Sequence, residues 1–143
     1  MKHTLTALLL GLFTASAVAA ESVNRSDLYA SCIVYQNTKW KAGLSGTLNY
    51  LTAPQIAQLE PYSFELIKQE CGCTVTAAFK SLSEDTIVAY NKSLTDNGDG
   101  ITLGTDAAAK EFQKAGMMDK KIACTVKSLD SSGYDQELKD LSK

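Results

Sequence analysis

Hydrophobic residues recur at intervals of three and four along most of this chain, which is the spacing of one face of an α-helix. The longest such run predicts a helix over residues 62–81, and Gly72 inside it weakens the helix without ending it. Its apolar members are Phe64, Ile67, Cys71, Val75, Ala78 and Leu82. Upstream, Thr52 followed by Pro54 and Gln55 is typical of a helix start, and Pro61 is expected to restart or kink that helix.

Shorter runs of the same kind predict further helices. The first covers residues 27–41 and can be capped by Asn24 or Ser26, and two later ones begin after Ser83 and Thr105. Their apolar positions are Leu28, Cys32, Tyr35 and Trp40 in the first helix, Ile87, Tyr90 and Leu94 in the second, and Ala108, Phe112 and Ala115 in the third.

The last part of the chain is less regular. Residues 118–129 are expected to form a core element through Ile122, Cys124 and Val126. A helix is favoured there, although residues 122–126 would also suit a strand. The polar tail after about residue 130 is predicted to be weakly ordered, with a frayed helix over 136–141. The predicted fold class is all-α: one domain over residues 21–143, built as a small bundle of four or five helices.

The first twenty residues have the pattern of a secretory signal peptide. Lys2 provides a positive charge, residues 5–13 form a short apolar stretch, and residues 18–20 are small and precede the expected cleavage site. The apolar stretch is shorter than the roughly 20 residues that a membrane-spanning helix needs. We therefore expect a periplasmic or secreted protein with no membrane span after cleavage.

Charge and histidine content narrow the possible functions. The 143 residues carry 14 Lys and Arg against 16 Asp and Glu, so there is no basic excess to bind nucleic acid. His3 is the sole histidine, and cleavage after Ala20 removes it and leaves a net charge of -3. Catalytic groups that depend on histidine and histidine-ligated zinc or haem are thereby excluded from the mature chain. No motif indicates a reaction, so neither an enzyme nor a cofactor is expected.

Four cysteines remain in the mature chain: Cys32, Cys71, Cys73 and Cys124. In an oxidising compartment an even number of cysteines indicates disulfides. A bond between Cys71 and Cys73 would close a strained ring, so we expect one bond from each of these two to Cys32 and to Cys124, with the pairing left open. The alternative interpretation is a redox pair formed by Cys71 and Cys73. A zinc site is disfavoured by the spacing.

The segment 95–106 is rich in Gly, Asp and Asn and partly resembles an EF-hand calcium loop. Aligning Gly100 with the loop's required glycine makes Asn97, Asp99 and Asp106 the candidate ligands. The first position is then Thr95 instead of Asp, and the last is Asp106 instead of a bidentate Glu. The same residues suit a tight turn, which we favour over calcium binding.

Aromatic residues concentrate in the first part of the mature chain. Tyr35, Trp40 and Tyr50 lie beside or within the glycine-containing segment 42–51, and aromatic residues in polar surroundings are typical of protein interfaces. The alternative is that their rings cover the connection between the first two helices. The leading hypothesis is a non-enzymatic module that binds another protein, as inhibitor, immunity and adaptor proteins do. A calcium-binding or a thiol-disulfide protein is the alternative.

Overall fold

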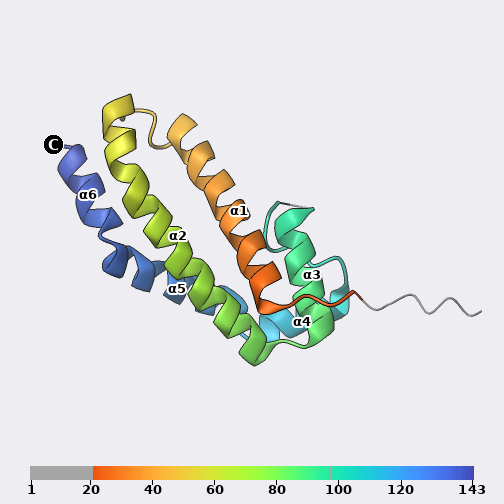
Figure 1. The fold of residues 1–143 in the computed structure, drawn as a ribbon. Helices are drawn as coiled ribbons and strands as arrows, with labels where there is room; N and C mark the ends of the chain where they lie inside the picture. The colour runs from red at the N-terminus through yellow and green to blue at the C-terminus, as the bar shows by residue number, and fades with distance from the viewer. Residues whose placement is uncertain (1–20, 97) are drawn as a thin grey trace, which may run out of the picture.

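The protein is described here by a computed structural model, which covers residues 21–96 and 98–143. Over these residues it contains six α-helices and no strand, so the all-α prediction is confirmed with one helix more than expected (Figure 1). The helices are α1 (Arg25–Ser45), α2 (Ala53–Ser81), α3 (Glu84–Thr95), α4 (Asp106–Lys114), α5 (Met117–Ser132) and α6 (Tyr134–Leu141). The predicted signal segment 1–20 lies outside the described residues.

The long helix α2 is the centre of the arrangement. It packs against α1 on one side and against α5 on another, while α6 lies beside its first turns (Figure 1). Helices α3 and α4 gather near the end of α2, where α3 also contacts α1 and α4 contacts α5. Each of the other helices therefore touches α2 or a helix that is packed against α2.

The helix starts follow the predicted caps. The side chain of Asn24 accepts a hydrogen bond from the backbone N–H of Asp27 at 3.0 Å, and Asp27 accepts one in return from Asn24 at 3.1 Å. The Oγ1 atom of Thr105 accepts from the N–H of Ala108 at 3.2 Å at the start of α4. These bonds satisfy N–H groups that the first turn of a helix leaves without backbone partners.

Pro61 was expected to restart or kink this helix; the restart is wrong, because α2 is one helix from Ala53 to Ser81 with the proline inside it, and the kink stays a prediction. A proline within a helix removes one backbone hydrogen bond and crowds the preceding turn. Burial on both sides of the proline offsets that cost, since Leu59 and Ile67 are both buried against neighbouring helices.

The buried side chains form two hydrophobic clusters. The first cluster is the larger one and joins α1 to α5. Its buried members are Leu28, Cys32, Ile67, Cys71, Val75, Ala78, Leu82, Ile87, Tyr90, Leu94, Leu103, Ala108, Phe112 and Met117. The second cluster is built on Leu51, Leu59 and Tyr134, with Leu138 and Leu141 packed against it. Trp40 packs against both clusters and so connects them.

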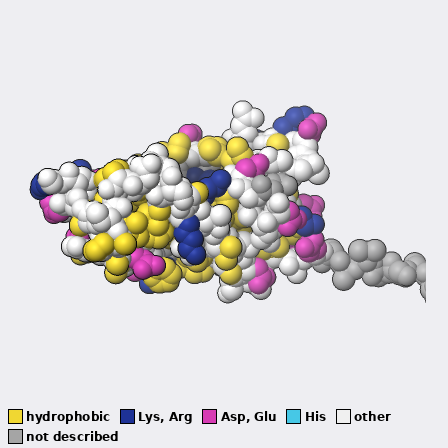
Figure 2. Space-filling view, turned by 90° about the horizontal axis from the view of Figure 1, so that it is seen from above, with side chains coloured by type: hydrophobic (Ala, Val, Ile, Leu, Met, Phe, Trp, Pro, Cys, Tyr) yellow, Lys and Arg dark blue, Asp and Glu magenta, His cyan; other side chains and the backbone are white. Residues whose placement is uncertain are grey.

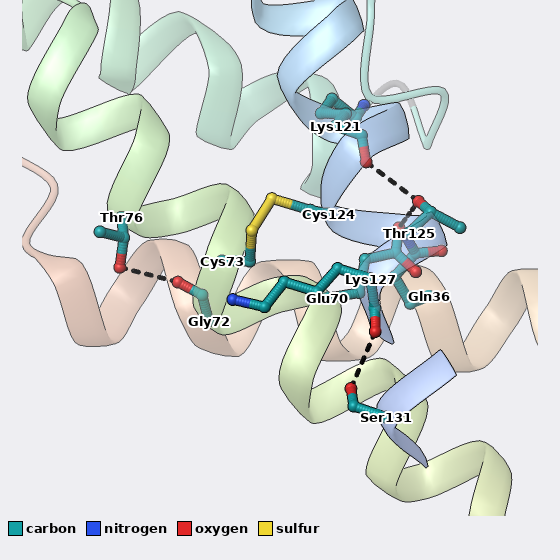
Figure 3. Close-up of a disulfide and its surroundings, with 10 residues drawn as sticks. All are labelled: Gln36, Glu70, Gly72, Cys73, Thr76, Lys121, Cys124, Thr125, Lys127 and Ser131. Carbon is teal, nitrogen blue, oxygen red and sulfur yellow. Dashed lines mark hydrogen bonds between the residues drawn. A yellow bond between two sulfur atoms is a disulfide. The ribbon is translucent and has the colours of Figure 1, made fainter. Parts of the chain in front are cut away.

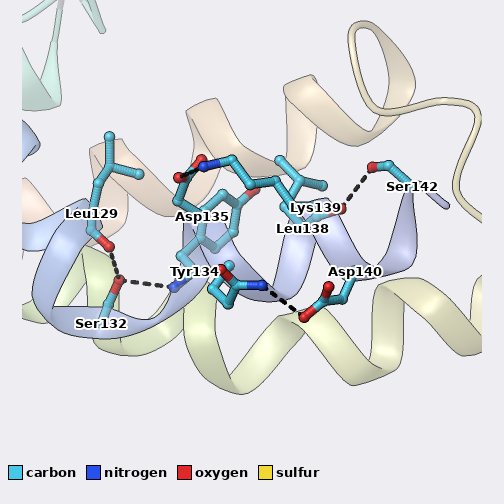
Figure 4. A network of polar contacts seen from close by, with 9 residues as sticks. Leu129, Ser132, Tyr134, Asp135, Leu138, Lys139, Asp140 and Ser142 are labelled. Carbon is cyan, nitrogen blue, oxygen red and sulfur yellow. Dashed lines mark hydrogen bonds and ion pairs between the residues drawn. The ribbon is translucent and has the colours of Figure 1, made fainter.

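The tail after residue 130 contains the helix predicted over 136–141, which begins two residues earlier than expected and packs against the rest of the protein. Helix α5 continues to Ser132, and Gly133 takes a left-handed conformation with φ of 74°, which lets α6 begin at once in a new direction. Figure 4 shows α6 with the Tyr134 ring among its neighbours, and Tyr134 is only 8% exposed. The Nε2 atom of Gln55 donates to the carbonyl of Leu141 at 2.9 Å. The tail is therefore packed against α2.

Candidate functional site

The disulfides join α2 to a different helix on each side. Cys32 in α1 bonds to Cys71 with a Cα–Cα distance of 5.7 Å, and Cys73 bonds to Cys124 in α5 with a distance of 5.6 Å. Figure 3 shows the second of these bonds. Residues two apart on a helix point about 200° from one another, which is why adjacent cysteines can reach opposite neighbours. This settles the open pairing. The structure contains no Cys71–Cys73 bond, because the two cysteines belong to separate disulfides, and it gives the redox hypothesis no support.

In the loop between α3 and α4, the Asp99 side chain accepts hydrogen bonds from residues of the same loop. The carboxylate of Asp99 accepts the backbone N–H groups of Ile101 and Thr102 at 2.9 and 2.8 Å, and the Thr102 hydroxyl also donates to it. These hydrogen bonds, that of the Thr102 side chain first, lower the pKa of Asp99 to about 2. Gly98 and Gly100 take positive φ angles of 63° and 67°. This part of the loop therefore has the bonding of a tight turn.

The residues predicted as calcium ligands do not form one site in the described structure. Asp106 lies in the first turn of α4, where a carboxylate favours the helix start, and Asn97 lies outside the described residues. Among the residues that the structure describes, no group of three or more His, Cys, Asp or Glu is placed to hold a metal ion. The described geometry supports the turn interpretation of this loop.

The three aromatic residues predicted to bind a partner occupy different environments. The Tyr35 hydroxyl donates to the carbonyl of Asp99 at 2.8 Å, so this side chain ties α1 to the loop. Trp40 is half-buried between the two clusters, and its indole nitrogen is shielded from solvent. Tyr50 is 56% exposed. Their joint binding role stays a prediction, and Trp40 has a structural position that accounts for it without a partner.

A polar cluster lies between α1, α2 and α5. The Oε1 atom of Glu70 accepts hydrogen bonds from Gln36 Nε2 at 2.6 Å and from Thr125 Oγ1 at 3.0 Å (Figure 3). The Nζ atom of Lys121 donates to the carbonyl of Gly100 at 3.2 Å. The sequence offered no sign of this cluster, because its members come from distant segments.

Burial acts in opposite directions on the two charged groups of this cluster. It raises the pKa of Glu70, against the smaller effects of the Thr125 hydrogen bond and the Lys121 charge. It lowers the pKa of Lys121, against the attraction of Glu70 and Asp99. Perturbed pairs of this kind are common at active sites. Here both groups are engaged by internal partners, so the arrangement holds the helices and the loop together.

The outer face of α5 is the largest departure from the sequence prediction. Ile122 and Val126 were expected in the core, yet they are 59% and 54% exposed, while Cys124 between them is 3% exposed. The expectation placed three residues at a spacing of two on one face, which only a strand would do. In the helix that forms, Cys124 points inward and its two neighbours point outward.

These exposed residues belong to a regular surface feature. Met118, Ile122 and Val126 follow one another at intervals of four on α5. Ile101, in the loop between α3 and α4, is 55% exposed and lines the same cavity as Met118. We refer to Ile101, Met118, Ile122 and Val126 as the apolar stripe. Ile101 and Met118 also border a cavity of about 300 Å³ that the buried residues Leu103 and Phe112 help to line. The stripe thus ends in a hollow with an apolar floor.

Exposed apolar side chains also occur elsewhere on the molecule. On the face drawn in Figure 2, hydrophobic side chains reach the surface in several patches, with lysine or arginine side chains among them. Single exposed apolar residues are ordinary on protein surfaces, whereas contiguous apolar patches mark interaction sites. The apolar stripe differs from single exposed apolar residues because its members are regularly spaced and a cavity adjoins them.

Comparisons with models of protein families, with curated proteins and with solved structures found no match to this chain. Within the described part of the chain, no helix combines the length and the apolar character needed to cross a membrane. The two disulfides are compatible with an exported protein.

Proposed function

We propose that this is an exported, non-enzymatic protein-binding module whose contact surface is the outer face of α5. The observation that carries the proposal is the apolar stripe, a row of exposed aliphatic side chains with a cavity at one end. Burying these side chains against a partner removes apolar surface from water, and this hydrophobic effect favours binding. Inhibitor, immunity and adaptor proteins would all fit this description.

The disulfide on the opposite side of α5 supports this proposal. Cys124 lies near the middle of the helix, faces inward and is bonded to Cys73 of α2. A covalent bond behind the helix holds its outer face in one position before any partner arrives. Such preorganisation raises affinity, because less conformational freedom is lost on binding. The predicted signal peptide and the disulfides together support action outside the cytoplasm.

The test is capture of partners from the native cell envelope with tagged wild-type and variant proteins. Ile122→Asp places a charge in the centre of the apolar stripe and should reduce capture of a specific partner at least tenfold. Because the Ile122 side chain is exposed, the melting temperature of the Ile122→Asp variant should stay within about 2 °C of that of wild type. Val34→Asp is the matched control, since Val34 is 66% exposed on α1 and should leave capture unchanged.

Two results would contradict the proposal. One is a partner that Ile122→Asp captures as well as the wild type does. The other is a partner that both variants lose equally, since that would indicate a general effect of an added charge and not a contact at α5.

A further inference from the structure

On the basis of the proposed function, we infer that the element received by the apolar stripe is a basic amphipathic helix of another protein. Two independent features of α5 lead to this inference: the spacing of its exposed aliphatic residues and the distribution of its charges. The first specifies the shape of the partner, and the second specifies its charge.

The spacing fits a helical partner. Met118, Ile122 and Val126 form a ridge of residues four apart, which runs about 12 Å along the helix axis. Ridges of this kind pack into the grooves between the corresponding ridges of a second helix. Helices that dock in this way place apolar anchors every three or four residues. The cavity beside Met118 can take the side chain of one such anchor.

The acidic side chains of α5 lie on its outer face. Asp119 and Asp130 are both exposed, and neither makes a hydrogen bond or an ion pair to a residue that the structure describes. Asp119 also lines the cavity at one end of the stripe. Asp130 lies one turn beyond Val126, roughly 16 Å along the helix axis from Asp119. An exposed carboxylate therefore stands near each end of the apolar stripe, and the charge of Asp130 also acts on Lys139 of α6.

The lysine side chains of α5 are directed away from the apolar stripe. Lys120 Nζ donates to the hydroxyl of Ser81 at 2.7 Å, and Lys121 Nζ donates to the carbonyl of Gly100 at 3.2 Å. Figure 3 shows the Lys127 side chain extended beside α2 toward Gly72, where it helps to line a hollow. The outer face of α5 is consequently acidic although the helix contains three lysines. Lysine or arginine residues on both flanks of a partner helix would complement it.

Two other occupants fit less well. A second copy of this chain would bring the same two carboxylates to the interface and would add negative charge to negative charge. An anionic membrane surface would be repelled by the acidic face for the same reason. A basic helix is the occupant that satisfies both the apolar ridge and the exposed carboxylates.

The test uses two synthetic peptides of fifteen residues and the oxidised mature protein. Both peptides carry Leu at positions i, i+4 and i+8 on a helix-forming background. One has Lys on both flanks of this row, and the other has Glu at the same positions. Binding is measured by fluorescence anisotropy at low and high salt, with wild type, Asp119→Asn/Asp130→Asn and Ile122→Asp.

We expect the Lys peptide to bind wild type about tenfold more tightly than the Glu peptide at low salt. That preference should fall to about twofold in the double Asn variant and at 0.5 M salt, because surface ion pairs are screened. Ile122→Asp should abolish binding of both peptides.

Equal affinity for the two peptides, or no binding of either, would overturn the inference. The proposed function is decided separately, by the partner-capture test. A dimer of the wild type that Ile122→Asp dissociates would instead identify a second copy as the occupant. Binding to vesicles of anionic lipid that depends on Ile122 would identify a membrane surface.

Discussion

The two hydrophobic clusters are restrained in different ways although one helix passes through both. The first cluster contains the Cys32–Cys71 disulfide, and the neighbouring Cys73–Cys124 bond ties the same half of α2 to α5. The second cluster is held by packing and by hydrogen bonds such as that from Gln58 Nε2 to Glu137 Oε1 at 2.8 Å. The comparison indicates that α6 and the start of α2 are the part of the molecule that can loosen alone.

The largest expected effect comes from removing the covalent restraint of the first cluster. Cys32→Ala/Cys71→Ala opens a cross-link with a sequence separation of 39 residues. In the chain-entropy account, its loss should lower the free energy of unfolding by about 4 kcal/mol. Urea denaturation without reductant measures the change. A loss below about 1 kcal/mol would mean that the disulfide adds little to the packing around it.

A smaller effect, but one that separates the clusters, comes from two leucines that are equally buried. Leu28→Ala in the first cluster and Leu59→Ala in the second should each cost about 3 kcal/mol, since both side chains are fully inaccessible. Amide hydrogen exchange should distinguish them. Leu59→Ala should speed exchange in α6 by local opening, whereas exchange there in Leu28→Ala should change only with global stability. Identical exchange patterns would remove the distinction between the clusters.

The smallest effect tests whether the polar cluster adds a pH dependence to the disulfide-linked half. Burial raises the pKa of Glu70 in the folded protein, so the folded state holds this proton more tightly than the unfolded state does. Stability attributable to Glu70 therefore falls as the pH rises from its usual pKa near 4.5 through the raised one. Glu70→Gln keeps an oxygen for Gln36 and Thr125.

Between pH 4 and pH 7, the free energy of unfolding of the variant should therefore rise relative to that of wild type. The rise should be less than about 1 kcal/mol, because Glu70 keeps some contact with water, which screens its charge. Thermal denaturation at several pH values provides the measurement. A difference between the two proteins that stays constant over this range would show that the Glu70 carboxyl titrates normally.

The sequence was a good guide where the pattern was local. The caps at Asn24 and Thr105, the apolar face of α3 and the participation of all four cysteines in disulfides follow from spacing and residue type. The unbroken course of α2 through Pro61 and the packing of the tail were not predicted, for a common reason. Each was assessed by local propensity, while burial of Leu59 and Tyr134 in the second cluster decides the outcome.

The candidate site was harder to predict. Ile122 and Val126 were assigned to the core because apolar residues usually lie inside. In a helix they share one face and Cys124 lies on the opposite one, and the disulfide of Cys124 decides which face is buried. The acidic outer face of α5 was equally hidden, since it depends on where Ser81 and Gly100 draw the side chains of Lys120 and Lys121.

The placement of Cys71 and Cys73 on either side of Gly72 has a consequence for how the protein matures. The exchanged pairing, Cys32 with Cys73 and Cys71 with Cys124, would change each native separation of 39 or 51 residues by only two. Loop-closure entropy therefore hardly distinguishes the two products in an unfolded chain. The choice is made by the turn of α2, which directs one thiol to each neighbour. Oxidation before α2 forms should yield both isomers, and a disulfide isomerase would be needed to recover the native one.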